Sequence, residues 1–372
     1  MTAVSAAREV SFRILTKVDA GGYASDLLRH ETATLDSRDA ALAETLVFGC
    51  LRYQNQLDFL IAHFAGRPQP KLDLEVRIAL RLGIFQLRYL DRVPAHAAVA
   101  ESVELVKSAH KRSATGFVNA VLRKVTRAPV RWPDRATELS LPAWMLERWE
   151  RDYGPAIARG IAEAALAEPE AYINLATGRR QDIGAQSIVP LLEIEPGMTV
   201  LDLCAAPGNK TAQAIAAGGL VTACDRYLRR LVEVPGDARR VVLDAADPLP
   251  FSTRCGLFDR ILIDAPCSGT GTLAGNPEIK WRLEPADLSA FQSRQRKMIE
   301  QALPHLRPGG RLVYATCSLE PEENEAVVQG LPVLATHLRI PGRDPGDGFF
   351  AATIQQGETR KRGAPSNPRA SA

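Results

Sequence analysis

A change of hydrophobic pattern near residue 183 constrains the fold of this chain more than any other feature. From about Ile183 onward, apolar strand-like runs alternate with helix-like segments. The strands we expect are Thr199–Leu203, Leu220–Cys224, Arg240–Leu243, Arg260–Asp264 and Arg311–Tyr314. Strands that alternate with helices pair in parallel, because each helix carries the chain back to the same edge of the sheet. The second half of the chain therefore predicts a doubly wound α/β domain.

The residues before this change follow a helical pattern instead. From residue 3 to about 128, apolar residues recur at three- and four-residue spacing, most clearly over 39–51, 74–90 and 116–125. This spacing predicts a helical bundle. The organisation that we expect is a bundle over 1–130, a helical linker over 131–182, the α/β domain over 183–356 and a disordered basic tail over 357–372.

The composition excludes several classes of protein. The chain has 372 residues, 46% hydrophobic and 24% charged, which suits a globular protein with two domains. No apolar stretch is long enough to span a bilayer, and the N-terminus lacks the pattern of a signal peptide. The six cysteines include no C-x-x-C pair, so we expect reduced thiols in the cytoplasm, with neither disulfides nor a bound metal.

Positive charge is concentrated in the helical half, although the net charge of the whole chain is only +3. The stretch from Lys107 to Arg135 holds eight Lys or Arg residues against one acidic residue, Asp134. A basic surface of this kind favours a polyanionic partner such as RNA. A solvated helix face explains the same charges equally well.

A loop of small residues follows the first expected strand, where the sequence is LDLCAAPGNKT from Leu201. Small residues let the backbone approach a ligand closely, and the free N–H groups of the next helix favour an anionic group such as an amino-acid carboxylate. The loop lacks the G-x-x-x-x-G-K-[ST] pattern of nucleotide triphosphatases. A glycine turn after a strand is, however, common in purely structural turns.

Acidic residues follow the next two strands. Asp225 ends the second strand, and Asp244 ends the third, followed by Ala245 and Ala246. In sheets of this type an acidic residue at the second strand accepts hydrogen bonds from ribose hydroxyls, and the third strand meets the adenine. Each aspartate could instead cap the following helix. Their succession at neighbouring strand ends favours an adenosine ligand.

Two cysteines lie at the ends of later strands, Cys267 in DAPCSG and Cys317 in YATCS. Parallel strands end at one edge of the sheet, so we expect these thiols to lie near the loop of small residues that follows the first strand. Methylation of cytosine at C5 requires such groups, because C5 becomes nucleophilic only after a thiolate has added to C6. An acid near N3 and a base complete the chemistry. A lone cysteine is usually structural, but two in matched settings favour covalent catalysis.

These segments resemble a known family of enzymes. LDLCAAPGNKT, DAPCSGTG and YATCSLEPEENEAVV are similar to three motifs of the Sun-family RNA cytosine-5 methyltransferases. DGFFAATI from Asp347 resembles the family's closing strand, and QDIGAQ from Gln181 the approach to its first motif. RDAALAETLVFGCLRY and GFVNAVLRK resemble the NusB-type RNA-binding domain, a combination typical of the RsmB-type 16S rRNA methyltransferases. The resemblance extends over nearly the whole chain. It implies an all-α NusB-like bundle followed by a Rossmann-like methyltransferase domain.

The resemblance also implies roles for matching positions. Cys317 would be the nucleophile, and Cys267 would assist release of the product. DNA cytosine-5 methyltransferases attack with the cysteine of a Pro-Cys motif, which makes Cys267 the competing nucleophile. Asp264 would meet cytosine N3 and the cofactor. The residues that would hold S-adenosylmethionine are Cys204, Ala205, Ala206, Pro207, Gly208, Asn209, Lys210, Asp225, Asp244 and Asp264. The implied substrate is RNA, most specifically 16S rRNA, for an enzyme that we expect to be monomeric.

Three departures from the family pattern bear on the function. Asn209 stands where the family's first motif has a second glycine, and residues 168–182 are too short for the family's RRM-like subdomain. The helix between Asp225 and Asp244 is abbreviated. These departures leave two alternatives to a 16S rRNA methyltransferase. One is a non-catalytic RNA-binding or ribosome-assembly factor with a degraded methyltransferase domain, and the other is a tRNA cytosine-5 methyltransferase.

Overall fold

The computed structural model describes residues 4–66, 68, 71–252 and 257–356, so the expected tail over 357–372 lies outside the described residues. The chain divides into two units. The helical unit holds the described residues up to Glu170, together with Ser268–Pro285 and Arg339–Gly348. The sheet unit holds Ala171–Cys267, Ala286–Leu338 and the described residues from Phe349 onward.

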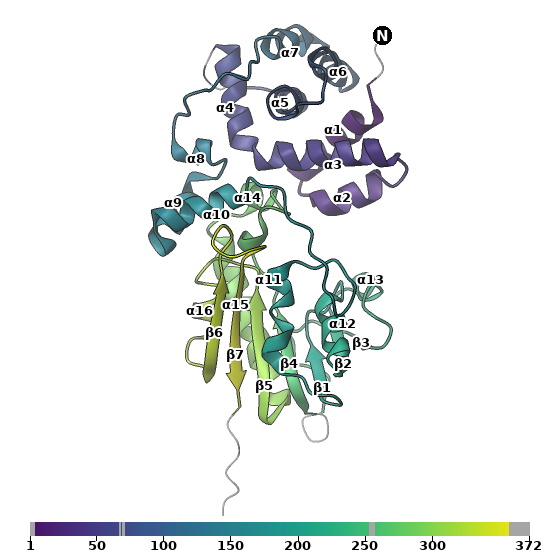
Figure 1. Ribbon diagram of the computed structural model, residues 1–372, viewed down its shortest axis with the longest axis vertical. Coiled ribbons are helices and arrows are strands. Elements are labelled where there is room, and N and C mark those ends of the chain that lie inside the picture. The colour runs from purple at the N-terminus through teal and green to yellow at the C-terminus, as the bar shows by residue number, and fades with distance from the viewer. Residues whose placement is uncertain (1–3, 67, 69–70, 253–256, 357–372) are drawn as a thin grey trace, which may run out of the picture. The chain divides into compact units, whose positions relative to one another are not determined.

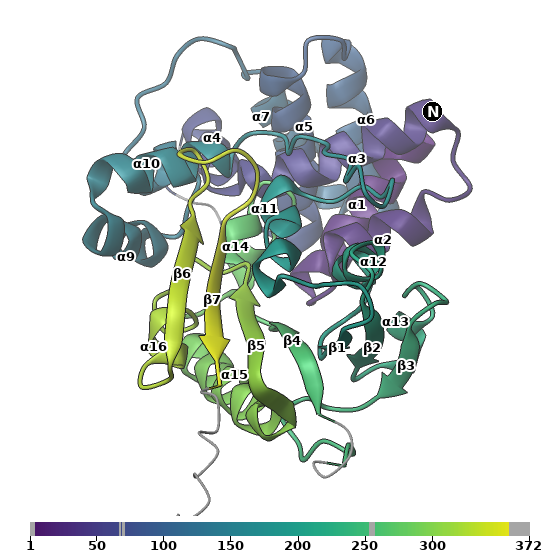
Figure 2. The same cartoon turned by 60° about the horizontal axis from the view of Figure 1, so that its bottom comes forward.

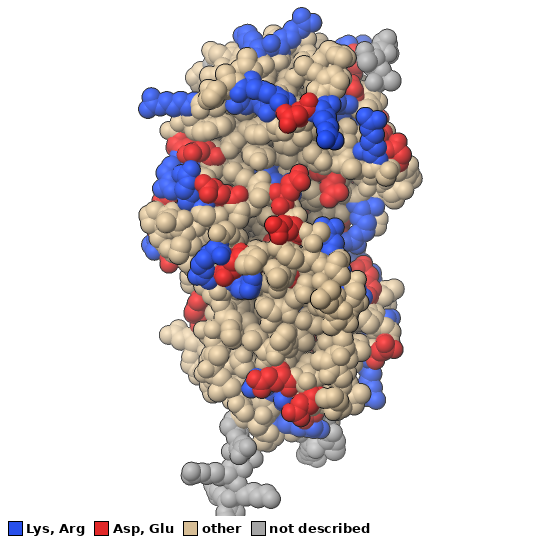
Figure 3. Space-filling view, in the orientation of Figure 1, with Lys and Arg blue, Asp and Glu red and all other residues tan. Residues whose placement is uncertain are grey.

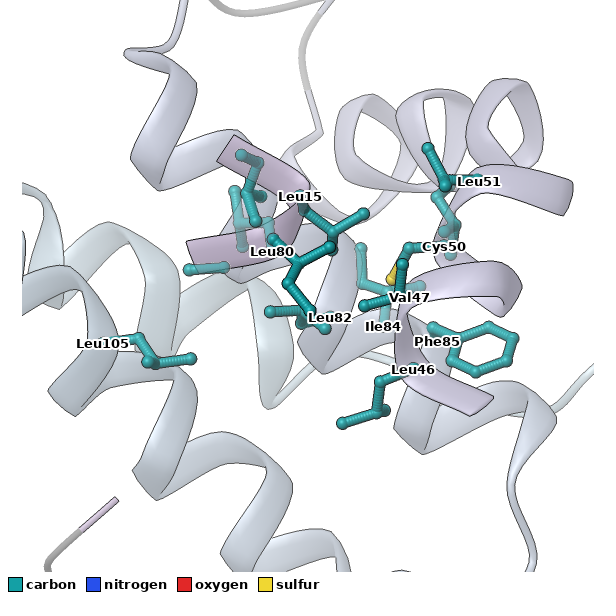
Figure 4. Close-up of a cluster of buried hydrophobic side chains, with 14 of the residues drawn as sticks. Leu15, Leu46, Val47, Cys50, Leu51, Leu80, Leu82, Ile84, Phe85 and Leu105 are labelled. Atoms are coloured by element: carbon teal, nitrogen blue, oxygen red, sulfur yellow. The ribbon is translucent and has the colours of Figure 1, made fainter. Parts of the chain in front are cut away.

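The helical unit is built around one buried helix, α5 (Leu74–Tyr89), which is seen end-on among the other helices of the unit in Figure 1. Every residue of α5 from Ile78 to Gln86 is buried, which is typical of a helix surrounded by others. The helices that pack around it are α1 (Ala6–Asp19), α3 (Ser37–Arg52), α4 (Gln54–Ala65), α6 (Ala95–Ser108) and α7 (Thr115–Leu122). Figure 4 shows leucine, isoleucine and phenylalanine side chains of α5 facing those of α3 in this core. The structure confirms the expected helical bundle.

Shorter helices complete this unit. They are α2 (Ala24–Glu31), η1 (Arg112–Ala114), α8 (Arg135–Glu138), α9 (Ala143–Tyr153) and α10 (Pro155–Ala164). Gly154, with a φ of 83°, separates α9 from α10, and Pro155 begins α10 at a position where a missing N–H costs nothing. The two helices pack against each other.

One segment of the helical unit comes from the second half of the sequence. Ser268–Pro285 includes η3 (Thr270–Thr272) and α14 (Ile279–Arg282), and it packs on α3. The Trp281 indole N–H donates to the Leu51 carbonyl at 2.7 Å, and the Arg52 guanidinium donates to the Ala274 carbonyl at 2.9 Å. The range 183–356, expected as one α/β domain, thus contains a stretch that folds with the helices.

The sheet unit contains a seven-stranded sheet of order β3-β2-β1-β4-β5-β7-β6. The strands are β1 (Thr199–Asp202), β2 (Leu220–Asp225), β3 (Arg239–Val242), β4 (Phe258–Asp264), β5 (Leu306–Thr316), β6 (Val333–Arg339) and β7 (Phe349–Gln355). The pairs that join β3, β2, β1, β4 and β5 are parallel, whereas β7 runs antiparallel to β5. The order reverses between β1 and β4, the position at which open α/β sheets bind ligands.

Both faces of the inner strands are buried, as their near-continuous apolar sequences indicate. Leu312 and Tyr314 of β5 pack into one core, while Val313 and Ala315 pack into another on the opposite face. Helices cover these cores (Figure 2): α11 (Ile183–Gln186), η2 (Val189–Leu192), α12 (Asn209–Ala216), α13 (Leu228–Leu231), α15 (Asp287–Ala302), η4 (Leu303–His305) and α16 (Glu325–Val328). The structure confirms the predicted Rossmann-like fold.

Candidate active site

The carboxyl ends of the parallel strands surround a cavity of about 380 Å³ in the sheet unit. Its walls combine apolar side chains with carboxylates, as expected of a pocket for a nucleoside-sized ligand. The cavity contacts seven residues predicted from the sequence: Cys204, Ala206, Asp225, Asp244, Asp264, Cys267 and Cys317. These residues are far apart in the sequence, but they lie together because parallel strands all end at the same edge of the sheet.

The two cysteines lie side by side. β4 pairs with β5 in a register that sets Asp264 opposite Ala315, so the loops after these strands are neighbours. The Sγ atoms of Cys267 and Cys317 are 3.3 Å apart, although 50 residues separate them in the chain. Both side chains are partly exposed and both contact the cavity, so a ligand there can reach either thiol.

Asp264 and Lys210 form an ion pair beside these thiols. The Lys210 ammonium donates to Asp264 Oδ2 at 2.6 Å and lies 5.2 Å from the centre of the Phe349 ring. Burial opposes the charge of Lys210, but Asp264 and, more weakly, Cys317 outweigh burial and raise the pKa of the ammonium above its ordinary value. The sequence placed Lys210 with the methionine end of the cofactor, whereas the structure joins its amine to the Asp264 carboxylate.

Gly208 forms the sharp turn of the loop of small residues between β1 and α12, which we call the cofactor loop. Its φ is 100°, and a Cβ built there would lie 2.7 Å from Pro235 Cδ and 2.8 Å from Val234 Cα. Asn209, in contrast, is the first residue of α12 and has no need of a left-handed backbone. Glycine is therefore required at 208, and the asparagine at 209 fits the helix.

A buried carboxylate bonds to the helix that follows the same loop. Asp202, at the end of β1, is 1% exposed, and its Oδ2 accepts a hydrogen bond from the Thr211 hydroxyl at 2.7 Å. Its Oδ1 has no hydrogen-bond partner among the described residues. Burial raises the pKa of Asp202 to about 7. Burial and nearby carboxylates also raise the pKa of Cys204 well above its ordinary value, so that thiol is a wall of the cavity and not a nucleophile.

Asp225 and Asp244 combine structural bonds with a place at the cavity. Asp225 accepts from the Tyr227 N–H at 2.9 Å, and Asp244 accepts from the Ala246 N–H at 3.0 Å. Asp244 also pairs with Arg294 of α15, whose Nη2 lies 2.7 and 2.9 Å from its two carboxylate oxygens. Burial opposes ionisation of Asp244, but the hydrogen bonds from Arg294 and Ala246 lower its pKa. Both aspartates also line the cavity, where their oxygens can accept hydrogen bonds from a ligand.

Sequence reasoning missed Arg294 and Gln295, because α15 carries no recognisable motif. Gln295 is fully buried and joins the two cysteine loops. Its side-chain amide donates to the Pro266 carbonyl at 3.1 Å and to Glu323 Oε1 at 3.0 Å. Glu323 in turn accepts from the Ser318 hydroxyl, one residue after Cys317, at 2.6 Å. This network fixes the loop of Cys267 against the loop of Cys317.

Among the described residues, no cluster of His, Cys, Asp and Glu could hold a metal ion. The donor set fits S-adenosylmethionine instead. The loop of small residues ends in the sharp turn at Gly208, and Asp225 and Asp244 line the cavity at the strand ends where sheets of this type bind ribose and adenine. In the same described part of the chain, no helix is long and apolar enough to cross a membrane.

Comparisons with known proteins agree with this geometry. The sequence profile of the 16S rRNA methyltransferase RsmB/F family matches residues 189–340, and that of the NusB family matches residues 5–127. The ribosomal RNA small subunit methyltransferase B of Erwinia tasmaniensis is 32% identical over 91% of this chain and 95% of its own length. The Yersinia pseudotuberculosis protein of that name is 31% identical over 93% of this chain and 98% of its own length.

A solved structure shows the same fold. The crystal structure of PH0851 matches with a TM-score of 0.75 over 96% of this chain and 100% of that one, at 19% sequence identity. Together with the sequence relatives, the cavity at the strand ends and the adjacent thiols lead to one conclusion. The chain belongs to the ribosomal RNA small subunit methyltransferase B family and is an S-adenosylmethionine-dependent RNA methyltransferase with an N-terminal NusB domain.

Proposed function

We propose that this protein transfers a methyl group from S-adenosylmethionine to C5 of a cytosine in 16S rRNA, through a covalent adduct between Cys317 and C6. The observation that carries the proposal is the placement of two thiols 3.3 Å apart beside the Asp264–Lys210 pair. The names of the relatives, which are small-subunit ribosomal RNA methyltransferases, support the choice of RNA.

The proposed reaction begins with Cys317. Cys317 adds to C6 as a thiolate, and the proton released from its thiol passes to N3, where the Asp264 carboxylate accepts a hydrogen bond from the resulting N–H. The Lys210 ammonium supplies a counter-charge near both groups. The addition makes C5 nucleophilic, so a bond forms from C5 to the methyl group as the sulfonium–methyl bond breaks. Bound S-adenosylmethionine supplies that electrophilic methyl group.

Release of the product requires a base and assigns a role to the second thiol. Once C5 is methylated, its remaining proton must pass to a base and the N3 proton must return to the departing Cys317 thiolate, so that the C6–sulfur bond can break and the ring can recover its double bond. Cys267, whose sulfur touches that of Cys317, is placed to assist this step as a thiolate. The roles of the two cysteines can also be exchanged, because both sulfurs contact the same cavity.

A pair of variants tests the assignment. Cys267→Ala should accumulate a covalent protein–RNA adduct, because release is impaired while attack is not. Cys317→Ala should form none. The adduct is measured as a slower band on a denaturing gel with labelled rRNA. An adduct with Cys317→Ala, and none with Cys267→Ala, would make Cys267 the nucleophile.

The helical unit offers a surface for the rRNA backbone. Figure 3 shows Lys and Arg side chains gathered over α5 to α7. Lys107, Lys111 and Arg127 of the basic stretch form ion pairs with acidic residues. Arg112 and Lys124 are exposed and form no ion pair with the described residues, so they are available to phosphates. The target cytosine must be unpaired or flipped to reach the thiols.

Bisulfite sequencing separates the alternative substrates. We expect rRNA from a deletion strain to lose one C5-methylated cytosine in 16S rRNA, with tRNA unchanged. Loss in tRNA instead would redirect the proposal. No change in either RNA would favour a non-catalytic assembly factor, to which the trimmed segment over 168–182 lends some support. An enzyme of rRNA works in the cytoplasm, and we predict a monomer by light scattering.

A further inference from the structure

A short hairpin precedes the cofactor loop in the chain and contacts it in space. Ile173 bridges to Arg180, and the Gln181 N–H donates to the Tyr172 carbonyl at 3.0 Å. Within the hairpin, the Asn174 amide donates to Gln181 Oε1 at 2.9 Å. This hairpin occupies the part of the sequence that is too short for a separate subdomain. It belongs to the sheet unit, as does the cofactor loop.

Asn209 is bonded to the hairpin from both ends of its amide. Arg179 Nε donates to Asn209 Oδ1 at 2.8 Å, and Asn209 Nδ2 donates to the Arg180 carbonyl at 3.2 Å. Arg179 Nη2 also lies 3.4 Å from the Pro207 carbonyl, two residues earlier in the loop. A guanidinium fork that spans a side chain and a backbone carbonyl restrains orientation as well as distance.

The position of Asn209 makes this contact consequential for the cofactor. Its neighbour on one side is Gly208, which forms the left-handed turn, and on the other side Lys210, which pairs with Asp264. Asn209 also begins α12, so its orientation sets the direction of the first N–H groups of that helix. A glycine at 209 would leave Arg179 Nε without its acceptor.

We propose that Arg179 and Asn209 act as a pair of positioning residues that hold the cofactor loop in the form that binds S-adenosylmethionine. A protein binds its ligand more weakly when a loop of the site must become ordered on binding. The contact between Arg179 and Asn209 orders the loop beforehand and so removes part of that free-energy cost. The inference rests on the proposed function only through the identity of the ligand. It adds Arg179 and its hairpin to the cofactor site, and it gives Asn209 a positioning role there.

Titration calorimetry with S-adenosylmethionine and with S-adenosylhomocysteine tests the pair without RNA. Arg179→Ala and Asn209→Gly should each weaken binding about tenfold, a size typical of residues in contact. Because either change breaks the same contact, the double variant should also lose about tenfold and not a hundredfold. Arg180→Ala is the matched control. It removes the same charge from the next residue, whose exposed side chain forms no hydrogen bond or ion pair with the described residues.

Three outcomes would overturn the inference: unchanged affinity in the two single variants, losses that multiply in the double variant, or an equal loss in Arg180→Ala. Hydrogen exchange gives a second measurement, since the amides of residues 205–210 should exchange faster in both single variants and at the wild-type rate in the control. Failure of the proposed chemistry is distinguishable from these outcomes. It would appear in the wild-type protein as ligand binding without an rRNA adduct or methyl transfer.

Discussion

At the scale of single residues, burial changes the chemistry of charged groups. Lys280 is 1% exposed, and its amine donates to the carbonyls of Arg52 and Ser140 at 2.8 and 2.9 Å. Burial, followed by the charge of Arg52, lowers the pKa of Lys280 to about 7. A neutral amine still has two N–H groups to donate, so both hydrogen bonds survive deprotonation. Lys280 therefore links the stability of the helical unit to pH.

This link has a definite sign. The unfolded chain holds the Lys280 proton up to its ordinary pKa of 10.5, whereas the folded chain releases it near 7. The unfolded state thus binds more protons between these values, and the free energy of unfolding should rise with pH across that window. The gain should be about 2 kcal/mol between pH 7 and pH 9.

Lys280→Met should remove this rise, and Lys297→Met, at an exposed lysine of α15, should retain it. Urea unfolding at the two pH values measures the difference. Asp202 does not mask this rise. Its raised pKa of about 7 makes the free energy of unfolding fall as pH rises, and this fall takes place from about pH 4 to pH 7, below the window of Lys280. A wild-type curve that is flat above pH 7 would contradict the assignment.

At the scale of elements, the turn between β1 and α12 depends on one glycine. Gly208 combines a φ of 100° with backbone of Val234 only 2.8 Å from where a Cβ would stand. Both features penalise any other residue, and neither can be relieved by turning a side chain. The turn consequently fixes where α12 begins and where its N–H groups point.

Gly208→Ala should lower the free energy of unfolding by about 1–3 kcal/mol and reduce affinity for S-adenosylmethionine at least tenfold. Gly160→Ala is the matched control, because Gly160 lies within α10 and nothing stands within 4 Å of its Cβ position. That change should be neutral or stabilising by about 1 kcal/mol. Denaturation curves and calorimetry check both variants, and wild-type binding in Gly208→Ala would refute the argument.

At the scale of the whole molecule, the two units do not follow the order of the sequence. The chain leaves the sheet unit after Cys267 and contributes Ser268–Pro285 to the helical unit. Trp281 packs on the helical core, and its indole N–H bonds to the Leu51 carbonyl. The helical unit is therefore incomplete without a segment from which residues 171–267 separate it in the chain.

Trp281→Ala should destabilise the helices by about 2–3 kcal/mol, less than the loss for a fully buried tryptophan, because the truncated side chain is large but only partly buried. Trp281→Phe should cost about 1 kcal/mol, because it removes mainly the hydrogen bond. Hydrogen exchange should show the faster amides in α3, far away in sequence. Leu334→Ala on β6, where the side chain is 57% exposed, serves as the control. Faster exchange confined to residues 268–285 would show that the helices do not depend on this segment.

Much of the fold follows from local patterns, and the exceptions have physical causes. The strands β1, β2, β4 and the end of β5 lie where apolar runs predicted them, because buried parallel strands must be apolar on both faces. The strand β6 escaped prediction, because it is largely exposed at the edge of the sheet and its sequence, VLATHLR, has no apolar run. Edge strands bury little apolar surface, so their sequences show little of the apolar pattern from which strands are predicted.

The sequence by itself determined that a helical bundle precedes an α/β domain, and it identified the motifs that meet at one end of the sheet. It could do so because hydrophobic periodicity, the residues at strand ends and glycine turns are all local properties of the chain. Only the tertiary structure decided the partners: Lys210 with Asp264, Arg294 with Asp244, Arg179 with Asn209, and α14 with the helical unit. Each of these contacts joins residues far apart in the chain. Such pairings depend on how elements pack, and no spacing along the sequence records them.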